Sequence, residues 1–420
     1  MSGAPIDAGR GETLLVLPGR LSRAAGVDAR RIAAEGLASG LARAGGEVRM
    51  LDLAGLRRPG AGSDSVRAGD GASAARGLVR RLPGVLRPAV GDVAAIRADR
   101  AMAASLRTRK MPRPDLVVQY HHRFQRAAIT FASNHGIPTI LRVEALEVRE
   151  EAAWGVRRPG YGGIVERWGE LDILRRADLL APVSHEIDRA LERAGIPSAR
   201  RVVVPNGVDI DAFRPGPPDE ALRRSLGVHG RFVIGWIGGF RPFHGLDMME
   251  PFVAALRARV PGAVLCLVGS GPTRSELEGR ARALGDAVVV AGPVAHDDVP
   301  RWLRSFDACV LFSEPGAFHY SPLKLLEFMA AGRPVVAPAV GDLAQELTDL
   351  SDALVVPAGD PVALATSVAA SANDPALAAR LGAEARRSVE RRGSWEARAR
   401  AMLDALDRRS QTLRMGARRG

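Results

Sequence analysis

Short apolar runs alternate with helical stretches along most of this 420-residue chain. The first such unit consists of TLLVLP (13–18), an alanine-rich stretch at 29–44 and EVRMLDL (47–53). Strand–helix–strand units at this spacing predict parallel sheets with right-handed crossovers, covered by helices on both faces. The alternation stops around 195–231, where proline and glycine gather, and resumes with FVIGWIGGF (232–240). We therefore expect an α/β chain with two doubly wound, Rossmann-like domains.

The interruption of this pattern sets the expected domain borders. Residues 1–200 should form an N-terminal domain and residues 201–385 a C-terminal domain that begins with a strand at 201–209. Residues 386–420 should form a helix that packs back on the N-terminal domain. Doubly wound sheets bind ligands outside the carboxyl ends of their strands. We therefore expect the two domains to face a central cleft that holds the ligand.

Basic residues exceed acidic residues by 12, and the excess is concentrated in two tracts. Residues 57–126 carry a net charge of +10 and residues 386–420 a net charge of +7. Such tracts attract phosphate groups, nucleic acid or anionic lipid, although a solvated arginine-rich surface has the same composition. Neither tract interleaves its arginines with the aromatic residues of a stacking platform for single strands. Nucleic acid therefore ranks last, and we expect no nucleic-acid partner.

The cysteine count and the apolar runs indicate a cellular compartment. Cys266 and Cys309 are too few for a disulfide framework, and both stand in short apolar runs typical of buried strands. The N-terminal residues lack the basic region of a secretory signal. No run approaches the roughly 18 apolar residues that a membrane-spanning helix needs. These features predict a cytoplasmic protein.

Glycine-rich turns follow two of the expected strands. The turn IGGFRPFHG (237–245) carries Arg241 and His244 at its mouth. Its glycines let the backbone approach a phosphate group, and nearby cations would neutralise that group. The stretch VGSGPTRSELE (268–278) lacks the third glycine and the following acidic residue of a dinucleotide fingerprint. We interpret this second stretch as a tight strand-to-helix turn.

The stretch SEPGAFHYSPLKLLEFMAAGRPVVAP (313–338) contains the strongest candidate for an anion site. Ser321 and Pro322 are typical of a helix start, where free N–H groups attract anions. Lys324 lies in the first turn, where a cation is unfavourable for the helix dipole unless an anion binds there. Glu327 follows one turn later on the same face, within reach of a ribose diol. A solvated salt bridge between Lys324 and Glu327 would fit the same spacing.

Four motifs follow one another at a spacing found in a known family. They are VVVPNGVDIDAF (202–213), the turn 237–245, LVGSGPTRSELE (267–278) and SPLKLLEFMAAGRPVVAP (321–338). Together they resemble the nucleotide-sugar-dependent glycosyltransferases of family 4. The resemblance implies the GT-B fold and retaining transfer of a sugar from a nucleoside diphosphate sugar. The acceptor is unidentified and could be a glycan, a lipid-linked molecule or a secondary metabolite.

The resemblance also assigns donor-binding positions. Glu327 matches the glutamate that holds the donor ribose in this family. The family's glycine pair after the first strand has Gly19 and Gly26 as its nearest candidates here. The segment whose backbone amides meet the diphosphate and the sugar is matched by Tyr320, Ser321, Pro322 and Leu323.

Several positions differ from the family's usual residues. His244 and Gly239 stand where the family has a phosphate-binding lysine and an arginine, and Arg241 follows two residues after Gly239. His319 replaces the first glutamate of the family's glutamate pair. Glu144 stands where many members carry a histidine that faces the donor sugar.

Catalysis in such a site is expected to be mostly electrostatic. Helix amides together with Lys324, Arg241 and His244 would stabilise the departing diphosphate. His319 and Glu144 complete the catalytic candidates, and no protein nucleophile stands out. We expect no cofactor beyond the nucleotide sugar and no metal, because cationic groups already face the diphosphate.

Two other functions share these sequence features. A non-catalytic nucleotide-sugar-binding protein on the same fold would explain the replaced donor contacts, and a sugar-nucleotide epimerase would act on the donor without an acceptor. The tract 57–126 is expected on the acceptor-side domain, where it would favour an anionic acceptor or peripheral contact with the inner face of an anionic membrane.

Two remaining patterns have ordinary structural explanations. The D-x-D sequence of Asp209 and Asp211 binds metal in a different glycosyltransferase fold, but here it lies inside a linker. His121 and His122, at the end of an expected strand, could face the cleft, although neutral loop histidines are the usual case.

Overall fold

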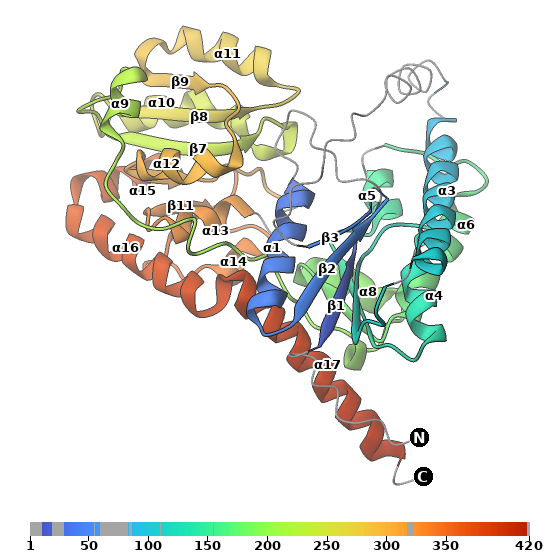
Figure 1. Ribbon diagram of the computed structural model, residues 1–420. Helices are drawn as coiled ribbons and strands as arrows, with labels where there is room; N and C mark the ends of the chain where they lie inside the picture. The colour runs from blue at the N-terminus through green and yellow to red at the C-terminus, as the bar shows by residue number, and fades with distance from the viewer. Residues whose placement is uncertain are drawn as a thin grey trace. The chain divides into compact units, whose positions relative to one another are not determined.

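Two six-stranded sheets organise the chain in the computed structural model (Figure 1). One compact unit consists mainly of Arg30–Pro205 together with the residues from Arg398 onward, and the other of Asn206–Ala397. The structure describes residues 11–18, 29–53, 55–58, 83, 86–109, 111–153, 155–316 and 323–417.

The sheet of the first unit has the strand order β3-β2-β1-β4-β5-β6. All its neighbouring pairs are parallel except β2 with β3, which is antiparallel and forms one edge. This order places a topological switch point between β1 and β4, as the doubly wound prediction requires. The strands are β1 (Glu12–Val16), β2 (Glu47–Asp52), β3 (Gly55–Arg57), β4 (Leu116–Tyr120), β5 (Thr139–Val143) and β6 (Leu179–Pro182).

Helix α1 matches the helical stretch predicted at 29–44, whereas α5, which follows β5, was not predicted from the sequence. Helix α3 spans 22 residues, and Pro88 in its first turn suits a helix start. The helical segments are α1 (Ala29–Arg43), α3 (Arg87–Thr108), α4 (Ala127–Asn134), α5 (Glu147–Ala153), α6 (Gly162–Ile164), the π-helical η1 (Val165–Leu171), α7 (Asp172–Arg176), α8 (His185–Arg193) and η2 (Ser198–Arg200). The final helix, α17 (Trp395–Ala417), lies mostly in the first unit.

The strand expected at 201–209 is not formed as a regular strand. Arg201 makes an isolated bridge to Leu180, and the N–H groups of Val202 and Val204 donate to the carbonyls of Leu180 and Pro182 at 3.0 and 2.9 Å. The segment thus pairs with β6 on one side only. The pairing stops after Val204 because β6 itself ends at Pro182 and Ser184 already caps the next helix.

The second unit has the strand order β12-β11-β10-β7-β8-β9, and all its pairs are parallel. Alternate residues of β8 enter two separate cores: Cys266 packs into one and Leu265 and Leu267 into the other. A sheet buried on both faces explains why its strands read as continuous apolar runs. The strands are β7 (Val233–Gly239), β8 (Val264–Ser270), β9 (Val288–Ala291), β10 (Ala308–Val310), β11 (Val335–Pro338) and β12 (Leu354–Val356).

Helices and short helical turns connect these strands. They are α9 (Glu220–Ser225), η3 (Pro242–His244), η4 (Leu246–Met248), α10 (Met249–Arg257), α11 (Arg274–Ala283), η5 (Gly285–Ala287), η6 (His296–Asp298), α12 (Val299–Arg304), α13 (Leu323–Ala330), α14 (Leu343–Glu346), α15 (Pro361–Asn373), α16 (Pro375–Ser388) and the π-helical η7 (Val389–Gly393). Both cysteines are fully buried in this sheet, as expected, and burial raises the pKa of the Cys266 thiol to about 12. Within the described residues, no helix combines the length and apolar character needed to cross a bilayer.

Candidate functional site

The switch point of the second sheet brings together the two segments that the sequence analysis singled out. Strands β7 and β10 are neighbours, and the chain leaves β7 through Gly238 and Gly239. The segment after β10 leads to α13, whose first described residue is Leu323. Because parallel strands end at the same edge, the glycine turn and the start of α13 lie on one side of the sheet.

The glycine turn is folded back onto the segment after β10. Gly245 has a φ of 66°, and a Cβ placed on it would lie 2.9 Å from the amide nitrogen of Ser313. A side chain at this position would be strained by the backbone conformation and would collide with that segment. Glycine at this position thus permits the close contact between the turn and the segment after β10.

Lys324 projects from the first turn of α13 toward the end of β7. Its Nζ lies 4.2 Å from the centroid of the Trp236 ring, a cation–π contact. A Cβ on Gly238 would lie 3.0 Å from the same nitrogen, so glycine leaves room for the ammonium group. Burial lowers the pKa of Lys324 to about 7, and the Glu327 carboxylate opposes that shift.

His244 lies beside the same tryptophan. The two ring centroids are 5.4 Å apart, with the planes edge to face. The Nδ1 of His244 faces the carbonyl oxygen of Gly239, which can only accept, so Nδ1 carries the proton and donates. Arg241 precedes His244 in the same turn; its amide donates to the carbonyl oxygen of Gly239 at 2.9 Å, and its side chain is exposed.

Glu327 stands one turn after Lys324 on α13 and is half-buried. Burial raises the pKa of its carboxyl group to about 7, although the Lys324 charge acts in the other direction. The pair therefore differs from a solvated surface salt bridge, because both groups are desolvated enough to titrate near neutral pH. Either group gains from a ligand of complementary charge or hydrogen bonding.

The structure thus gathers five of the predicted donor-site residues around one edge: Gly239, Arg241, His244, Lys324 and Glu327. Leu323 opens α13 beside them, whereas Glu144 belongs to the first unit, directly after β5. The other predicted positions lie outside the described residues: Gly19, Gly26, His319, Tyr320, Ser321 and Pro322.

The D-x-D sequence has a structural role in the described linker. The Asp209 carboxylate accepts hydrogen bonds from the amides of Asp211 and Ala212 at 2.9 and 3.1 Å, which caps a turn. Among the residues that the structure describes, no group of three or more His, Cys, Asp or Glu side chains could hold a metal ion.

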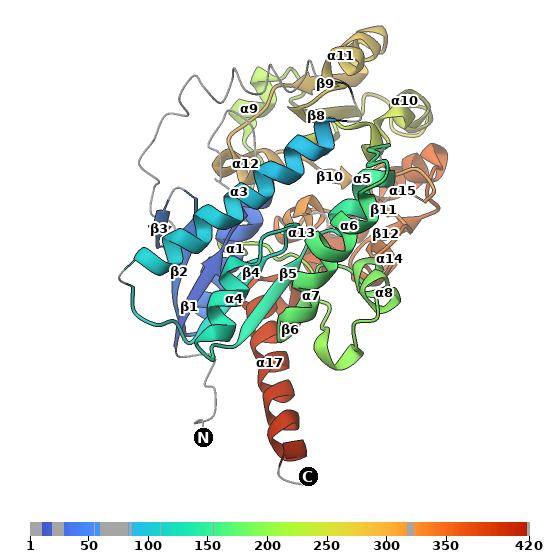
Figure 2. The same ribbon diagram turned by 90° about the vertical axis from the view of Figure 1, so that its right-hand side faces the viewer.

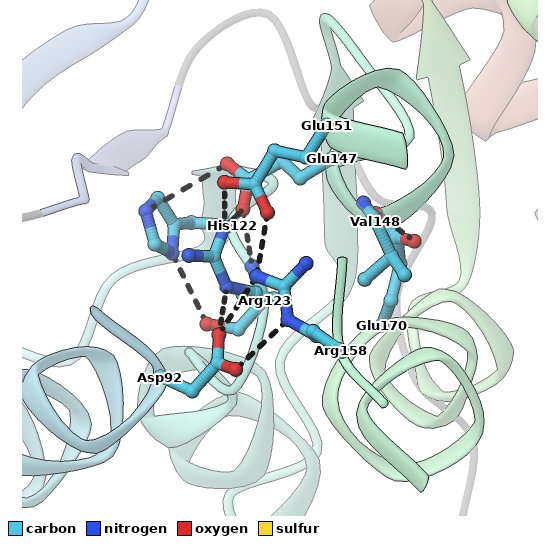
Figure 3. A network of polar contacts seen from close by, with 8 residues as sticks. All are labelled: Asp92, His122, Arg123, Glu147, Val148, Glu151, Arg158 and Glu170. Atoms are coloured by element: carbon cyan, nitrogen blue, oxygen red, sulfur yellow. Dashed lines mark hydrogen bonds and ion pairs between the residues drawn. The ribbon is translucent and has the colours of Figure 1, made fainter. Parts of the chain in front are cut away.

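The first unit contains a buried network of ionic side chains that sequence analysis missed (Figure 3). Arg123 donates to Asp92, Glu147 and Glu151 at 2.7, 3.0 and 3.0 Å. Arg158 donates through Nε to Asp92 at 2.9 Å and through a terminal nitrogen to Glu151 at 2.5 Å. Figure 3 shows both guanidinium groups lying between Asp92 on one side and the two glutamates on the other. The network joins α3, the loop after β4, α5 and the segment before α6.

The loop after β4 is held in a strained conformation beside this network. Phe124 has a φ of 64°, rare for a bulky residue, and its amide donates to Gly169 at 2.6 Å. Gly169 lies in the π-helical η1, and a Cβ there would lie 2.8 Å from the Phe124 ring. Strain and π-helical turns concentrate at functional sites, so this loop is a second candidate region.

The two histidines of this loop have different surroundings. His121 is buried, and desolvation lowers its pKa to about 4, so it is neutral near pH 7. The half-buried His122 has its Nδ1 at 3.1 Å from the carbonyl oxygen of Arg123 and its Nε2 at 3.7 Å from a Glu147 oxygen. Of these two histidines, only His122 reaches the surface of the loop.

Two family models match the chain. The model described as Glycosyltransferase Family 4 matches residues 32–212, and the model described as Glycosyl transferases group 1 matches residues 231–374. The first match contains most of the first sheet, and the second contains the whole second sheet.

Curated relatives carry related names. The D-inositol 3-phosphate glycosyltransferase of Streptomyces avermitilis is 33% identical over 249 residues, which are 56% of this chain and 53% of the relative. The 2-deoxystreptamine N-acetyl-D-glucosaminyltransferase of Streptomyces fradiae is 36% identical over 167 residues, 38% of either chain. The match thus spans about half the length of the first relative and less of the second.

Solved structures share the fold over nearly the whole chain. Sucrose-phosphate synthase from Thermosynechococcus elongatus has a TM-score of 0.63 at 22% identity, with 97% of this chain and 100% of that chain covered. HepE from Anabaena, in complex with UDP, has a TM-score of 0.65 at 18% identity, with 94% and 99% covered. These neighbours confirm the predicted GT-B fold. The two family models, which match residues 32–212 and 231–374, show that the chain belongs to glycosyltransferase family 4.

Proposed function

We propose that this protein transfers a sugar, with retention of configuration, from a nucleoside diphosphate sugar to an acceptor. The observation that carries the proposal is the position of the Lys324 ammonium. It lies against Trp236, beside the glycine turn and one turn before Glu327. A desolvated cation at the start of a helix of this fold gains most from a diphosphate.

The proposed donor contacts follow from this arrangement. Lys324, Arg241 and His244 neutralise charge that develops on the departing diphosphate, and Glu327 accepts hydrogen bonds from the ribose hydroxyls. Since these groups and the helix amides supply the positive charge, we propose that transfer requires no metal. His319 and Glu144 remain proposed contacts of the donor sugar.

Similar proteins suggest which donors and acceptors to test first. HepE has been solved with UDP and with UDP-glucose, so uridine nucleotides are the first donors to test. The names of two relatives specify D-inositol 3-phosphate and 2-deoxystreptamine, both substituted cyclohexane polyols. We propose a polyhydroxylated acceptor that binds in the first unit near His122, beside an anionic membrane surface.

A donor panel tests the proposal directly. The protein is incubated with UDP-, GDP-, ADP- and dTDP-sugars, with and without cyclitols, and products are identified by mass spectrometry. Transfer or slow donor hydrolysis that persists in EDTA supports the proposal. Tight binding without turnover would favour a non-catalytic binding protein, and an isomerised donor without acceptor would favour an epimerase. Activity that disappears in EDTA and returns with magnesium would contradict metal independence.

Donor affinity is expected to be highest near pH 7 and to fall on both sides. Above pH 7 the Lys324 ammonium, with its lowered pKa, loses its proton, and below pH 7 the Glu327 carboxylate, with its raised pKa, gains one. Calorimetric titration of UDP-glucose, whose diphosphate is esterified at both ends and does not titrate in this range, measures this profile across pH 5.5–8.5. Glu327→Gln should weaken binding by roughly 10- to 100-fold at pH 7 and remove the decline on the acid side.

Lys324→Arg is the matched control for the alkaline side of the pH profile, because a guanidinium group stays charged throughout this pH range. It should remove the alkaline decline and leave the acid decline in place. If both variants keep the wild-type profile, the pair does not contact the donor.

A further inference from the structure

Helix α3 presents an outer face on which no acidic side chain is exposed. Its two aspartates both point into the first unit, where Asp92 binds the buried arginines and Asp99 accepts from the amides of Arg126 and Ala127 at 2.8 and 2.7 Å. The arginines of the helix are exposed instead: Arg87, Arg97, Arg100 and Arg107. This separation of charge gives α3 a positive outer face.

Large aliphatic side chains are exposed on the same face. Leu86, Val90 and Val93 are 50%, 39% and 48% exposed and follow one another at four- and three-residue spacing. That spacing places them on one side of the helix, and Arg97 and Arg100 continue the same side one and two turns later. The opposite side packs into the core through Met102 and Leu106 and is buried.

From this pattern we infer that the outer face of α3 docks on an anionic lipid bilayer. Aliphatic side chains at the start of the helix enter the headgroup region, and the arginines that follow pair with lipid phosphates. Figure 2 looks onto α3, which runs across one face of the first sheet with no other helix or strand drawn in front of it. Arg97, Arg100 and Arg107 belong to the tract 57–126, of which residues 59–82, 84, 85 and 110 lie outside the described residues.

A lipid surface fits this face better than a nucleic acid does. Phosphates of a duplex would engage the arginines but leave Leu86, Val90 and Val93 in water. Residues 86–109 contain no aromatic side chain on which bases could stack. A bilayer satisfies both sets of side chains, because it offers phosphate and hydrocarbon at adjacent depths.

Vesicle sedimentation tests the inference without requiring turnover. The inference extends the proposed function, in which transfer takes place beside an anionic membrane. In the assay, the full-length chain is mixed only with vesicles of phosphatidylcholine and phosphatidylglycerol, 1:1, or of phosphatidylcholine alone. We expect binding to the anionic vesicles that weakens steeply between 0.1 and 0.5 M salt. Changing Arg97, Arg100 and Arg107 together to Gln should lower the partition coefficient by a factor on the order of 100.

A charge-matched variant separates a specific face from general basicity. Arg224, Arg259 and Arg282 are exposed in the second unit, so replacing these three with Gln changes the net charge equally. This control should bind vesicles like the wild type. Equal loss in both triple variants, or no wild-type binding to anionic vesicles, would overturn the inference. So would stronger binding of a 20-base-pair duplex that the Arg97, Arg100 and Arg107 changes abolish.

Insertion of the aliphatic side chains into the bilayer can be measured separately by fluorescence. Because Cys266 and Cys309 are fully buried, a thiol introduced by Val93→Cys can be labelled selectively with an environment-sensitive fluorophore. Anionic vesicles should shift its emission to the blue, whereas a label introduced through Ala258→Cys, on the exposed surface of the second unit, should not shift. Val90→Ser combined with Val93→Ser should weaken binding about tenfold at unchanged charge. An unshifted Val93 label would contradict insertion of this face. The affinity for UDP should be unchanged in every variant. A failure of the membrane inference would therefore leave the proposed transferase activity untouched.

Discussion

Lys324→Met is expected to lower kcat/KM for the nucleotide-sugar donor by about 100- to 1000-fold, the usual loss when one preorganised charge-stabilising group is removed. The ammonium is held against Trp236 and is partly desolvated, so its interaction with a diphosphate is only weakly screened by water. Initial rates of donor hydrolysis or transfer measure the effect. Arg259→Met, on the exposed surface of the same unit, is the control.

The stability of the Lys324→Met variant should not decrease. Methionine keeps the contact with the Trp236 ring and removes a charge whose burial is unfavourable, as its lowered pKa indicates. The thermal unfolding midpoint is therefore expected to stay the same or to rise. A variant that keeps kcat/KM within threefold of the wild type would show that the cation does not meet the reacting phosphate.

Asp92→Ala is expected to destabilise the first unit by about 3–5 kcal/mol, the range found when one partner of a buried ion pair is removed. Its carboxylate binds Arg123 and Arg158 at once, and all three side chains are at least nine-tenths buried. The remaining glutamates cannot compensate both arginines fully. Differential scanning calorimetry, which can resolve the unfolding of separate units, measures the change.

A surface ion pair provides the comparison for this variant. Asp286 lies 2.8 Å from Arg257 but is largely exposed, so Asp286→Ala should leave the unfolding midpoint unchanged. Asp92→Asn keeps the shape of the side chain and one hydrogen-bond acceptor, so its unfolding temperature should lie between those of Asp92→Ala and Asp286→Ala. If Asp92→Ala unfolds at the same temperature as Asp286→Ala, the network does not stabilise the unit.

Much of the architecture is readable in the sequence because buried parallel strands leave a strong signal. Continuous apolar runs such as those of β7 and β8 are bounded by glycine, and helices of regular length separate them. The three-residue strand β3 leaves no such signal, since it pairs only with β2 at a sheet edge. The strand expected at 201–209 has the right apolar pattern, but its partner β6 ends at Pro182, so the pairing stops at Val204.

Less of the candidate site than of the fold could be predicted from the sequence. Lys324 and Glu327 stand out because their spacing on one helix is local. The contact of Lys324 with Trp236 joins residues almost ninety positions apart and depends on the tertiary fold. The network around Arg123 joins four separate segments, and charged residues in EVREEAAWGVRRP (147–159) read equally well as a solvated face. Sequence periodicity cannot tell which arginines will be buried.

The composition of the first unit bears on the order in which the protein can fold during synthesis. Helix α17 contributes Ala399, Met402 and Leu406 to the buried interior, yet Asn206–Ala397 must be translated between Pro205 and Arg398. At translation rates of about 5–20 residues per second this takes roughly 10–40 s. During this interval the first unit therefore lacks the apolar side chains of α17, while the second unit is synthesised and can fold. Chaperones that bind exposed apolar segments would have their longest opportunity during that interval.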